Sequence, residues 1–196
     1  MNTWFTADDH FNHGNIIKYC NRPFKNVEEM NETIISKHNA RVDDDDIVFD
    51  LGDFMFRNSP GGKPGEGKQD KSLVFLRRLK GRRINVKGNH DRNNSLKTCI
   101  EKIYIRYGGY DICLVHNPAH ADPKCELNLV GHVHSAWKIK RLNAKSIMIN
   151  VGVDVHNFSP ISFDEIQKCI SQFKKEEKNG NSKATEERNK KSSTTP

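Results

Sequence analysis

The sequence repeats one pattern: a short strand-like run is followed directly by side chains that can bind a metal or move a proton. The clearest case is the run at residues 82–87, which leads into Gly88-Asn89-His90-Asp91. Its β-branched residues favour a strand, and a glycine at the strand end lets the backbone turn sharply. In α/β proteins, sites are built at such strand ends. This repeated pattern constrains the fold more strongly than composition does.

The first half of the chain alternates predicted strands with predicted helices. Strands are expected at residues 2–7, 46–51 and 82–87, and helices at residues 15–20, 27–41 and 73–80. The helical segments show apolar residues at helical spacing, and the run at 46–51 is apolar enough for a strand buried on both faces. This order predicts an α/β fold.

The second half of the chain shows successive predicted strands without helices between them. Strand-like runs with short turns occupy residues 102–107, 110–116, 126–131, 137–142 and 145–151. Gly108-Gly109 and Asn143-Ala144 are typical of hairpin connections, so we expect mostly antiparallel pairing here. A final helix begins near Ser162. Together the halves predict two facing β-sheets with helices on the outer faces.

One domain is expected over residues 1–173, with a disordered charged tail at residues 174–196. The tail consists of Lys, Glu, Asn, Ser and Thr, with almost no apolar residues. Residues 58–70 are rich in glycine and proline and are interpreted as a loop or lid, because structure resumes directly after them.

Composition narrows the class of protein. No apolar run approaches the roughly 20 residues that span a bilayer, and no secretory signal is expected, because the chain starts in a strand-like run. Five scattered cysteines without a C-x-x-C indicate reduced thiols, so we expect a cytoplasmic protein without a membrane partner. The net charge of +7 suits an anionic partner, although an ordinary lysine-rich surface explains it equally well.

Seven side chains at the ends of these runs are candidate metal ligands. They are Asp8, His10, Asp53, Asn89, His116, His132 and His134. An H-x-H on a strand places both imidazoles on one face, because side chains alternate with period two. Carboxylate, amide and imidazole ligands without a thiolate suit Mn²⁺, Fe or Zn²⁺. Since seven ligands exceed one tetrahedral set, the pattern predicts two metal ions that share a bridging carboxylate.

Each segment has an ordinary alternative when it stands alone. Asp-x-His and Gly-Asp sequences are typical of turns, and His132 with His134 could be a surface pair. His116, which follows an apolar run, could be a buried core histidine. All five segments occur together, each at the end of a predicted strand, so chance explains the combination poorly.

The chain resembles the calcineurin-like metallophosphoesterase superfamily over residues 1 to about 170. The resemblance is carried by Asp8-Asp9-His10, Gly52-Asp53, Gly88-Asn89-His90-Asp91, His116 and Gly131-His132-Val133-His134. Residues 11–17 and 150–154 are similar to a compact bacterial and phage-type branch. The resemblance implies a four-layer αββα sandwich, with two mixed β-sheets flanked by helices and a dinuclear site.

The resemblance also implies roles for individual residues. Asp8, His10 and His134 would hold the first metal. Asn89, His116 and His132 would hold the second, and Asp53 would bridge the two. His90 would be the general acid, with Asp91 orienting it. Two positions depart from the family pattern: Asp9 within Asp-x-His, and Asn117 where many relatives have glycine. Both departures concern substrate preference.

Four further side chains are candidates for substrate contact. Arg22, Arg57 and Arg92 could clamp a phosphate bidentately, with a solvated surface arginine as the alternative for each, and His13 could face the site.

The predicted function is metal-dependent hydrolysis of a phosphate ester. A phosphodiester is favoured over a phosphomonoester, and a nucleotide or nucleic-acid-derived substrate is expected. The two divalent ions are expected to be Mn²⁺, with Fe, Zn²⁺ or Ni²⁺ as alternatives. One other interpretation is a non-catalytic metal-binding scaffold, as in a retromer subunit of this fold that lacks the catalytic histidine. Another is a nucleic-acid-binding module, although no aromatic-basic interleaving is present. The substrate and the oligomeric state stay open.

Overall fold

The computed structural model describes residues 1–56, 71–93, 96 and 98–192, with the side chains of residues 92, 93 and 180–192 left undescribed. The chain divides into two compact units, Met1–Phe163 and Asp164–Pro196. The predicted loop at residues 58–70 lies outside the described residues.

The first sheet joins three parallel strands and one antiparallel strand, in the order β3-β2-β1-β9. The strands are β1 (Thr3–Thr6), β2 (Ile47–Asp50), β3 (Arg82–Asn85) and β9 (Ile161–Ser162). Because β1, β2 and β3 are parallel, their carboxyl ends meet at one edge of the sheet. The predicted ligands that follow these strands are therefore brought to the same place.

The second sheet has the order β4-β5-β6-β8-β7. Its strands are β4 (Lys102–Tyr107), β5 (Tyr110–Val115), β6 (Leu127–Val130), β7 (Ile139–Arg141) and β8 (Ile147–Asn150). β4 and β5 form a hairpin through Gly108 and Gly109, and both glycines have positive φ. β7 and β8 form the second antiparallel pair, while β6 lies parallel to both β5 and β8.

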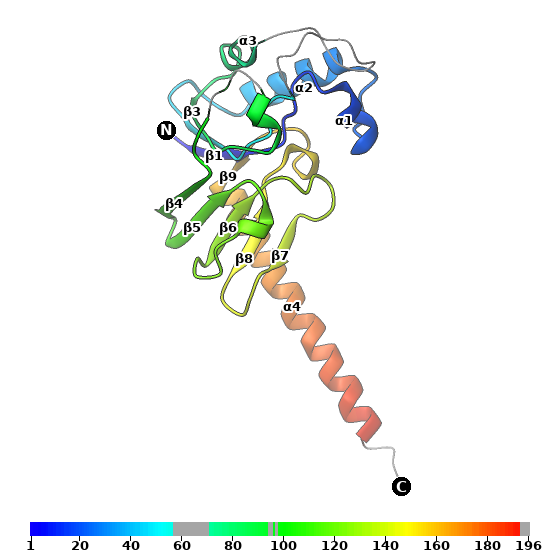
Figure 1. The fold of residues 1–196 in the computed structure, drawn as a ribbon. Coiled ribbons are helices and arrows are strands. Elements are labelled where there is room, and N and C mark those ends of the chain that lie inside the picture. Colours follow the sequence, from blue (N-terminus) through cyan, green and yellow to red (C-terminus); the bar gives the residue numbers. More distant parts are fainter. Residues whose placement is uncertain (57–70, 94–95, 97, 193–196) are drawn as a thin grey trace. The chain divides into compact units, whose positions relative to one another are not determined.

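The first unit contains three α-helices and three 3₁₀ helices among its described residues. They are α1 (Gly14–Tyr19), α2 (Val27–Asn39) and α3 (Ser72–Leu76), with single-turn 3₁₀ helices η1 (His90–Asn93), η2 (Pro118–His120) and η3 (Val153–Val155). The side chain of Asn26 caps α2 by accepting a hydrogen bond from the backbone N–H of Glu29. Figure 1 shows α1, α2 and α3 on the side of the first sheet away from the second sheet.

A buried apolar cluster fixes these helices. Met30 and Ile34 of α2 and Phe75 of α3 pack with Phe11 and Phe54, which follow β1 and β2. The Phe11 and Phe75 rings stack with their centroids 4.6 Å apart. Phe11 comes directly after His10 and Phe54 directly after Asp53, so packing of the core also holds the two loops that carry these ligands.

The prediction of an α/β fold with two mixed sheets and helices is confirmed. The expectation of mostly antiparallel pairing in the second half is wrong, because β5, β6 and β8 run parallel. The connections from β5 to β6 and from β6 to β8 are long enough to return the chain to the starting edge. Alternation of apolar residues identifies strands without identifying their partners.

The second unit consists of the helix α4 (Phe163–Ser192), which begins at the last residue of the first unit. Ile166 and Ile170 of this helix are buried. Disorder of residues 174–196 stays a prediction. Within the described ranges, every helix is too short or too polar to cross a bilayer.

Candidate metal centre

The predicted ligands share an unusual backbone conformation. Five of the seven have positive φ: Asp8 (60°), His10 (53°), Asp53 (56°), His132 (71°) and His134 (46°). This left-handed conformation costs a side-chain-bearing residue about 1 kcal/mol, because its Cβ crowds the backbone. Such strain persists only where the surrounding structure imposes it, and it gathers at functional sites.

Hydrogen bonds between loops impose these conformations. The N–H of Asp8 donates to the carbonyl of Gly52 at 2.9 Å, and the N–H of His10 donates to the carbonyl of Asp53 at 3.0 Å. Gly52 has φ +96°, and a Cβ there would lie 2.5 Å from the backbone nitrogen of Gly88. The loops after β1, β2 and β3 are therefore in direct backbone contact.

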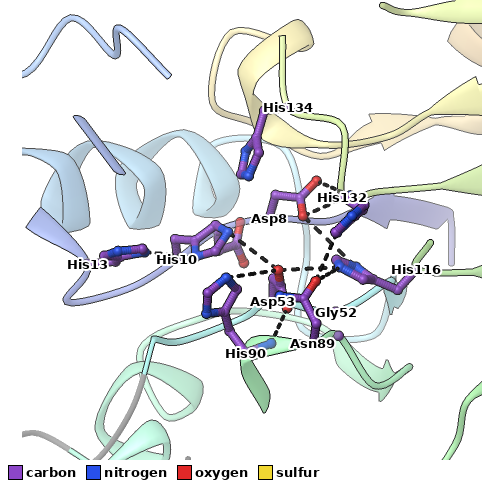
Figure 2. A network of polar contacts seen from close by, with 12 residues as sticks. Asp8, His10, His13, Gly52, Asp53, Asn89, His90, His116, His132 and His134 are labelled. Carbon is purple, nitrogen blue, oxygen red and sulfur yellow. Dashed lines mark hydrogen bonds and ion pairs between the residues drawn. The ribbon is translucent and has the colours of Figure 1, made fainter. Parts of the chain in front are cut away.

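Four overlapping sets of three potential ligands occur among the described residues. Two of these sets are His10, Asp53 and His90, and Cys20, His134 and Asp154. The other two match the predicted ligands and are called the two donor groups. Within each group the ligand atoms lie within 4.8 Å of one another. One group is Asp8, His10 and His134, and the other is Asp53, His116 and His132. Asn89 belongs with the second group, because its Oδ1 lies 2.8 Å from Nδ1 of His132 and 3.1 Å from Nε2 of His116. Figure 2 shows these side chains converging on Asp53.

Asp53 lies between the two groups. Its Oδ2 is 3.3 Å from Nε2 of His116 in one group and 3.6 Å from Nε2 of His10 in the other. Its Oδ1 accepts a hydrogen bond from the backbone N–H of His90 at 2.8 Å. Burial would raise the pKa of Asp53, but the hydrogen bond with His116 and its charge hold that pKa below its ordinary value. The carboxylate is therefore ionised and within reach of both groups.

Three imidazoles are fixed through Nδ1, which directs Nε2 into the site. Nδ1 of His116 is 2.8 Å from the carbonyl of Leu51, and Nδ1 of His134 is 2.9 Å from Oδ2 of Asp154. Nδ1 of His10 is 3.2 Å from Nδ1 of His13. This arrangement, with the outer nitrogen held by a second residue, is typical of metal-binding histidines.

The hydrogen bonding of His10 and the pKa values of Asp8 and His116 also fit a bound metal ion. Nε2 of His10 is buried and has no hydrogen-bond partner among the described residues. Burial raises the pKa of Asp8 to about 6. Burial alone would lower the pKa of His116, but its hydrogen bond with Asp53 and the charges of Asp8 and Asp53 raise it to about 9. A cation would relieve all three, because it stabilises carboxylate charge and takes the place of a proton on imidazole.

Arg22 is buried and bonded to protein groups. Its Nε and Nη2 donate to the carboxylate of Asp154 at 2.8 and 2.9 Å, and Nη2 also donates to the carbonyl of Asp8 at 2.7 Å. Nη1 donates to the carbonyl of Asp9 and contacts the sulfur of Met30. Arg22 therefore positions the Asp8 loop, and its predicted contact with substrate stays a prediction.

Asp154 is the positioning residue that sequence reasoning missed. Its carboxylate accepts from Arg22 and pairs with His134, so it joins the end of β1 to the loop after β6. Burial would raise its pKa, but these two partners hold that pKa below its ordinary value. A carboxylate shortly after β8 was the available signal, because it repeats the pattern of polar residues after a strand.

The remaining predicted substrate contacts lie as follows. His13 is 4% exposed, and its ring stacks on Phe56 with centroids 3.9 Å apart, so it contacts His10 and is closed off from solvent. Contact of His13 with a substrate is therefore replaced by a role in orienting His10. Arg57 and the side chain of Arg92 lie outside the described residues.

His90 is a half-exposed side chain of the centre. Its ring is 36% exposed, with Nε2 4.0 Å from Oδ2 of Asp53 and its centroid 5.1 Å from that of His10. Oδ2 of Asp91 accepts from the backbone N–H groups of Gly88 and Asp53 at 2.8 and 2.9 Å. Asp91 thus ties the backbone of Gly88, two residues before His90, to the backbone of Asp53 in the loop after β2. Its predicted effect on the His90 ring stays a prediction.

Comparison with known proteins finds matches both by sequence and by structure. No protein-family model matches the chain. The uncharacterized protein MJ1445 of Methanocaldococcus jannaschii is 39% identical over 178 residues, which cover 87% of this chain and 92% of that protein. The solved structure of AQ665 from Aquifex aeolicus, a protein of unknown function, is 28% identical with a TM-score of 0.65, over 86% of this chain and 98% of its own.

A more distant solved structure has a described activity. Yfce, a phosphoesterase from E. coli, is 16% identical over 76% of this chain and 78% of its own, with a TM-score of 0.39. This likeness is too distant to support an argument about chemistry, which depends on the side chains of the centre itself.

Proposed function

We propose that this chain, which belongs to the same family as the Methanocaldococcus jannaschii protein, is a calcineurin-like metallophosphoesterase that hydrolyses phosphodiesters with two divalent metal ions, as its fold and five-segment motif support. The observation that carries the proposal is the place of Asp53, whose carboxylate lies within 3.3–3.6 Å of an imidazole from each donor group.

Each donor group has a ligand set that suits one ion. Asp8, His10 and His134 would hold the first, and Asn89, His116 and His132 would hold the second. Asp53 would contact both. Nitrogen and oxygen donors favour Mn²⁺, with Fe, Zn²⁺ and Ni²⁺ as alternatives. When bound, such ions supply Lewis acidity, which polarises a phosphoryl oxygen and lowers the pKa of water.

The protein's own contribution is to orient groups and to supply a proton. His90 is exposed beside Asp53, where it can donate a proton to the departing oxygen of the ester. Asp91 holds the Asp53 and Gly88 backbones, which keeps His90 at a fixed distance from the ligands. Since Asn89 supplies the ligand of this turn, the His90 imidazole is available for proton transfer.

A diester is favoured because the centre is open on one side. A pocket of about 290 Å³ lies against Asn89, His116 and His132 and can accept a second substituent on phosphorus. A monoester would leave this space unused. A nucleotide or nucleic-acid-derived ester fits the net charge of +7.

The test is hydrolysis of bis-p-nitrophenyl phosphate and p-nitrophenyl phosphate, with metal-stripped protein reconstituted with Mn²⁺, Fe²⁺, Zn²⁺ or Ni²⁺. We expect metal-dependent turnover, faster with the diester, and up to two bound ions per chain by elemental analysis. Full activity after exhaustive metal stripping would overturn the proposal.

The scaffold alternative makes the opposite prediction. A protein that uses this fold only to bind partners would take up metal without turnover. All seven ligand positions and His90 are occupied by functional side chains here, which favours the enzyme. Affinity for a nucleic acid that survives EDTA, without hydrolysis, would instead favour a nucleic-acid-binding module.

A further inference from the structure

The pocket beside the second donor group has a lining that the proposed chemistry does not use. Lys87, Asn117 and His120 line it together with the ligands Asn89, His116 and His132, and Glu101 lies at the same pocket. Within the described part of the chain, no Phe, Tyr or Trp contributes to its wall. A nucleobase would find no large aromatic ring to stack on, whereas an anion would find an ammonium and an imidazole.

Local structure places the two basic side chains there. The backbone N–H of Lys87 donates to the carbonyl of Ile100 at 2.7 Å, which fixes the chain just before Gly88 and Asn89. Asn117 caps η2 by accepting from the N–H of Ala119, and η2 ends at His120. The Asn117 cap therefore helps to build the turn that carries His120 to the pocket.

The charge of Lys87 is available to a ligand. Its Nζ lies 3.8 Å from a carboxylate oxygen of Glu101, whose side chain is 81% exposed. An exposed pair at this distance contributes little, so an anion can displace Glu101 at small cost. His120 is also exposed and has an N–H donor in either tautomer.

The position of His90 determines how the substrate is oriented in the centre. His90 lies beside His10 and Asp53, whereas the pocket lies against Asn89, His116 and His132. A leaving group protonated by His90 therefore departs on the side of the first donor group. The substituent that stays on phosphorus is directed into the pocket.

We infer that Lys87 and His120 form a specificity pocket for a phosphate group carried by the retained substituent of a phosphodiester. This inference rests on the proposed phosphoesterase function. The phosphate can be the terminal group of a nucleotide or the next phosphate of a nucleic-acid strand, because both offer anionic oxygens to the same two donors.

The test follows release of p-nitrophenolate, so that the same bond and the same leaving group are measured in every ester. Thymidine 5′-(p-nitrophenyl phosphate) is compared with its 3′-phosphorylated form in the presence of Mn²⁺. We expect kcat/KM to be about tenfold higher for the phosphorylated ester, mainly through KM, and the advantage to shrink as salt increases. A third ester, with a second nucleoside on the 3′-phosphate, separates the two sources: a retained advantage identifies a strand, and a lost one identifies a terminal phosphate.

Variants connect the preference to the two side chains. The double variant Lys87→Met/His120→Gln should bring the ratio of kcat/KM values close to one, with the unphosphorylated ester hydrolysed as before. Glu101→Gln should increase the ratio, because it removes the competing carboxylate. Lys145→Met, an exposed lysine in the β7–β8 hairpin, is the matched control and should leave the ratio unchanged. Equal kcat/KM for both esters in the wild type, or equal loss on both in the double variant, would overturn the inference.

A binding measurement keeps this result separate from the proposed function. If neither ester is hydrolysed with any metal, the proposed function fails, and calorimetry with thymidine 3′,5′-bisphosphate and thymidine 5′-phosphate then decides about the pocket. Binding of the bisphosphate about tenfold tighter, lost in Lys87→Met/His120→Gln, supports the pocket. Equal affinity for the two nucleotides overturns it.

Discussion

The two donor groups of the centre differ in how they are supported. In the first group, Asp8 and His10 are fully buried. His13 contacts the outer nitrogen of His10, and Asp154 contacts the outer nitrogen of His134. In the second group, Asn89 is exposed and the ligands line an open pocket. The first group is held by protein side chains on its outer side, and the second meets the solvent.

This difference predicts different roles for the two metal ions. A group whose imidazoles are held at their outer nitrogens binds its ion tightly, because these contacts fix the ligand orientation. An open group can exchange water for substrate, since its coordination is completed from solvent. We therefore expect the first ion to act mainly as an anchor and the second to act where the retained part of the substrate binds.

The largest effect is expected from Asp53→Asn, which breaks the link between the two groups. Loss of the carboxylate should remove most bound metal and lower kcat/KM on the order of 10³-fold for every substrate. Elemental analysis and kinetics on bis-p-nitrophenyl phosphate measure both. Asp111→Asn, an exposed carboxylate on β5, is the control and should change neither. Unchanged metal content in Asp53→Asn would show that the groups do not share this ligand.

The next largest effect concerns His90, which belongs to neither ligand group in the proposed function. His90→Ala should retain near-normal metal content and lose about 10²-fold on an alkyl or nucleoside phosphodiester, because a general acid is missing. Loss on a p-nitrophenyl ester should be much smaller, since that leaving group needs little protonation. Metal loss equal to that of His116→Ala would make His90 a ligand, and equal loss on both substrate types would make it a positioning residue.

A smaller, one-sided effect is expected from Asp154→Asn. The change removes the carboxylate behind His134 and the partner of Arg22, both on the side of the first group. Affinity for one ion should fall about 10–100-fold while the other stays bound. Titration with a chelator, followed by counting ions per chain, measures this asymmetry, with Asp111→Asn again as control. Simultaneous loss of both ions would contradict the division between the groups.

The sequence predicted the candidate ligands from strand ends, and the family resemblance implied their division into two sets; the structure brings Asp8, His10 and His134 together, and likewise Asp53, His116 and His132. The reason is general: parallel strands β1, β2 and β3 deliver their carboxyl ends to one edge, so polar residues after each strand meet there. The prediction that His132 and His134 share one face of a strand is wrong, because both lie in the loop after β6 with positive φ and join different donor groups.

What the sequence could not predict are contacts between distant segments. Arg22 and Asp154 are 132 residues apart, and no spacing rule connects an arginine after α1 with a carboxylate after β8. The parallel pairing of β5, β6 and β8 was missed for a related reason, because alternation shows a strand's faces and not its neighbours. The left-handed backbone of five ligands also leaves no signature at residues other than glycine.

The smallest effect is expected at the end of the chain, far in sequence from both donor groups. Removal of residues 174–196 retains the buried Ile166 and Ile170 of α4, and the described side chains from 174 to 179 are exposed or half-exposed and polar. Truncation after Phe173 should therefore leave kcat/KM on a small diester within about twofold, since the described side chains of the removed segment bury no apolar surface. Circular dichroism verifies folding of the truncated protein. If the truncated protein folds but is inactive on the small diester, residues 174–196 belong to the catalytic unit. If it loses activity only on a nucleic acid, the seven basic residues after Ser171 act as an electrostatic arm that concentrates long substrates near the open group.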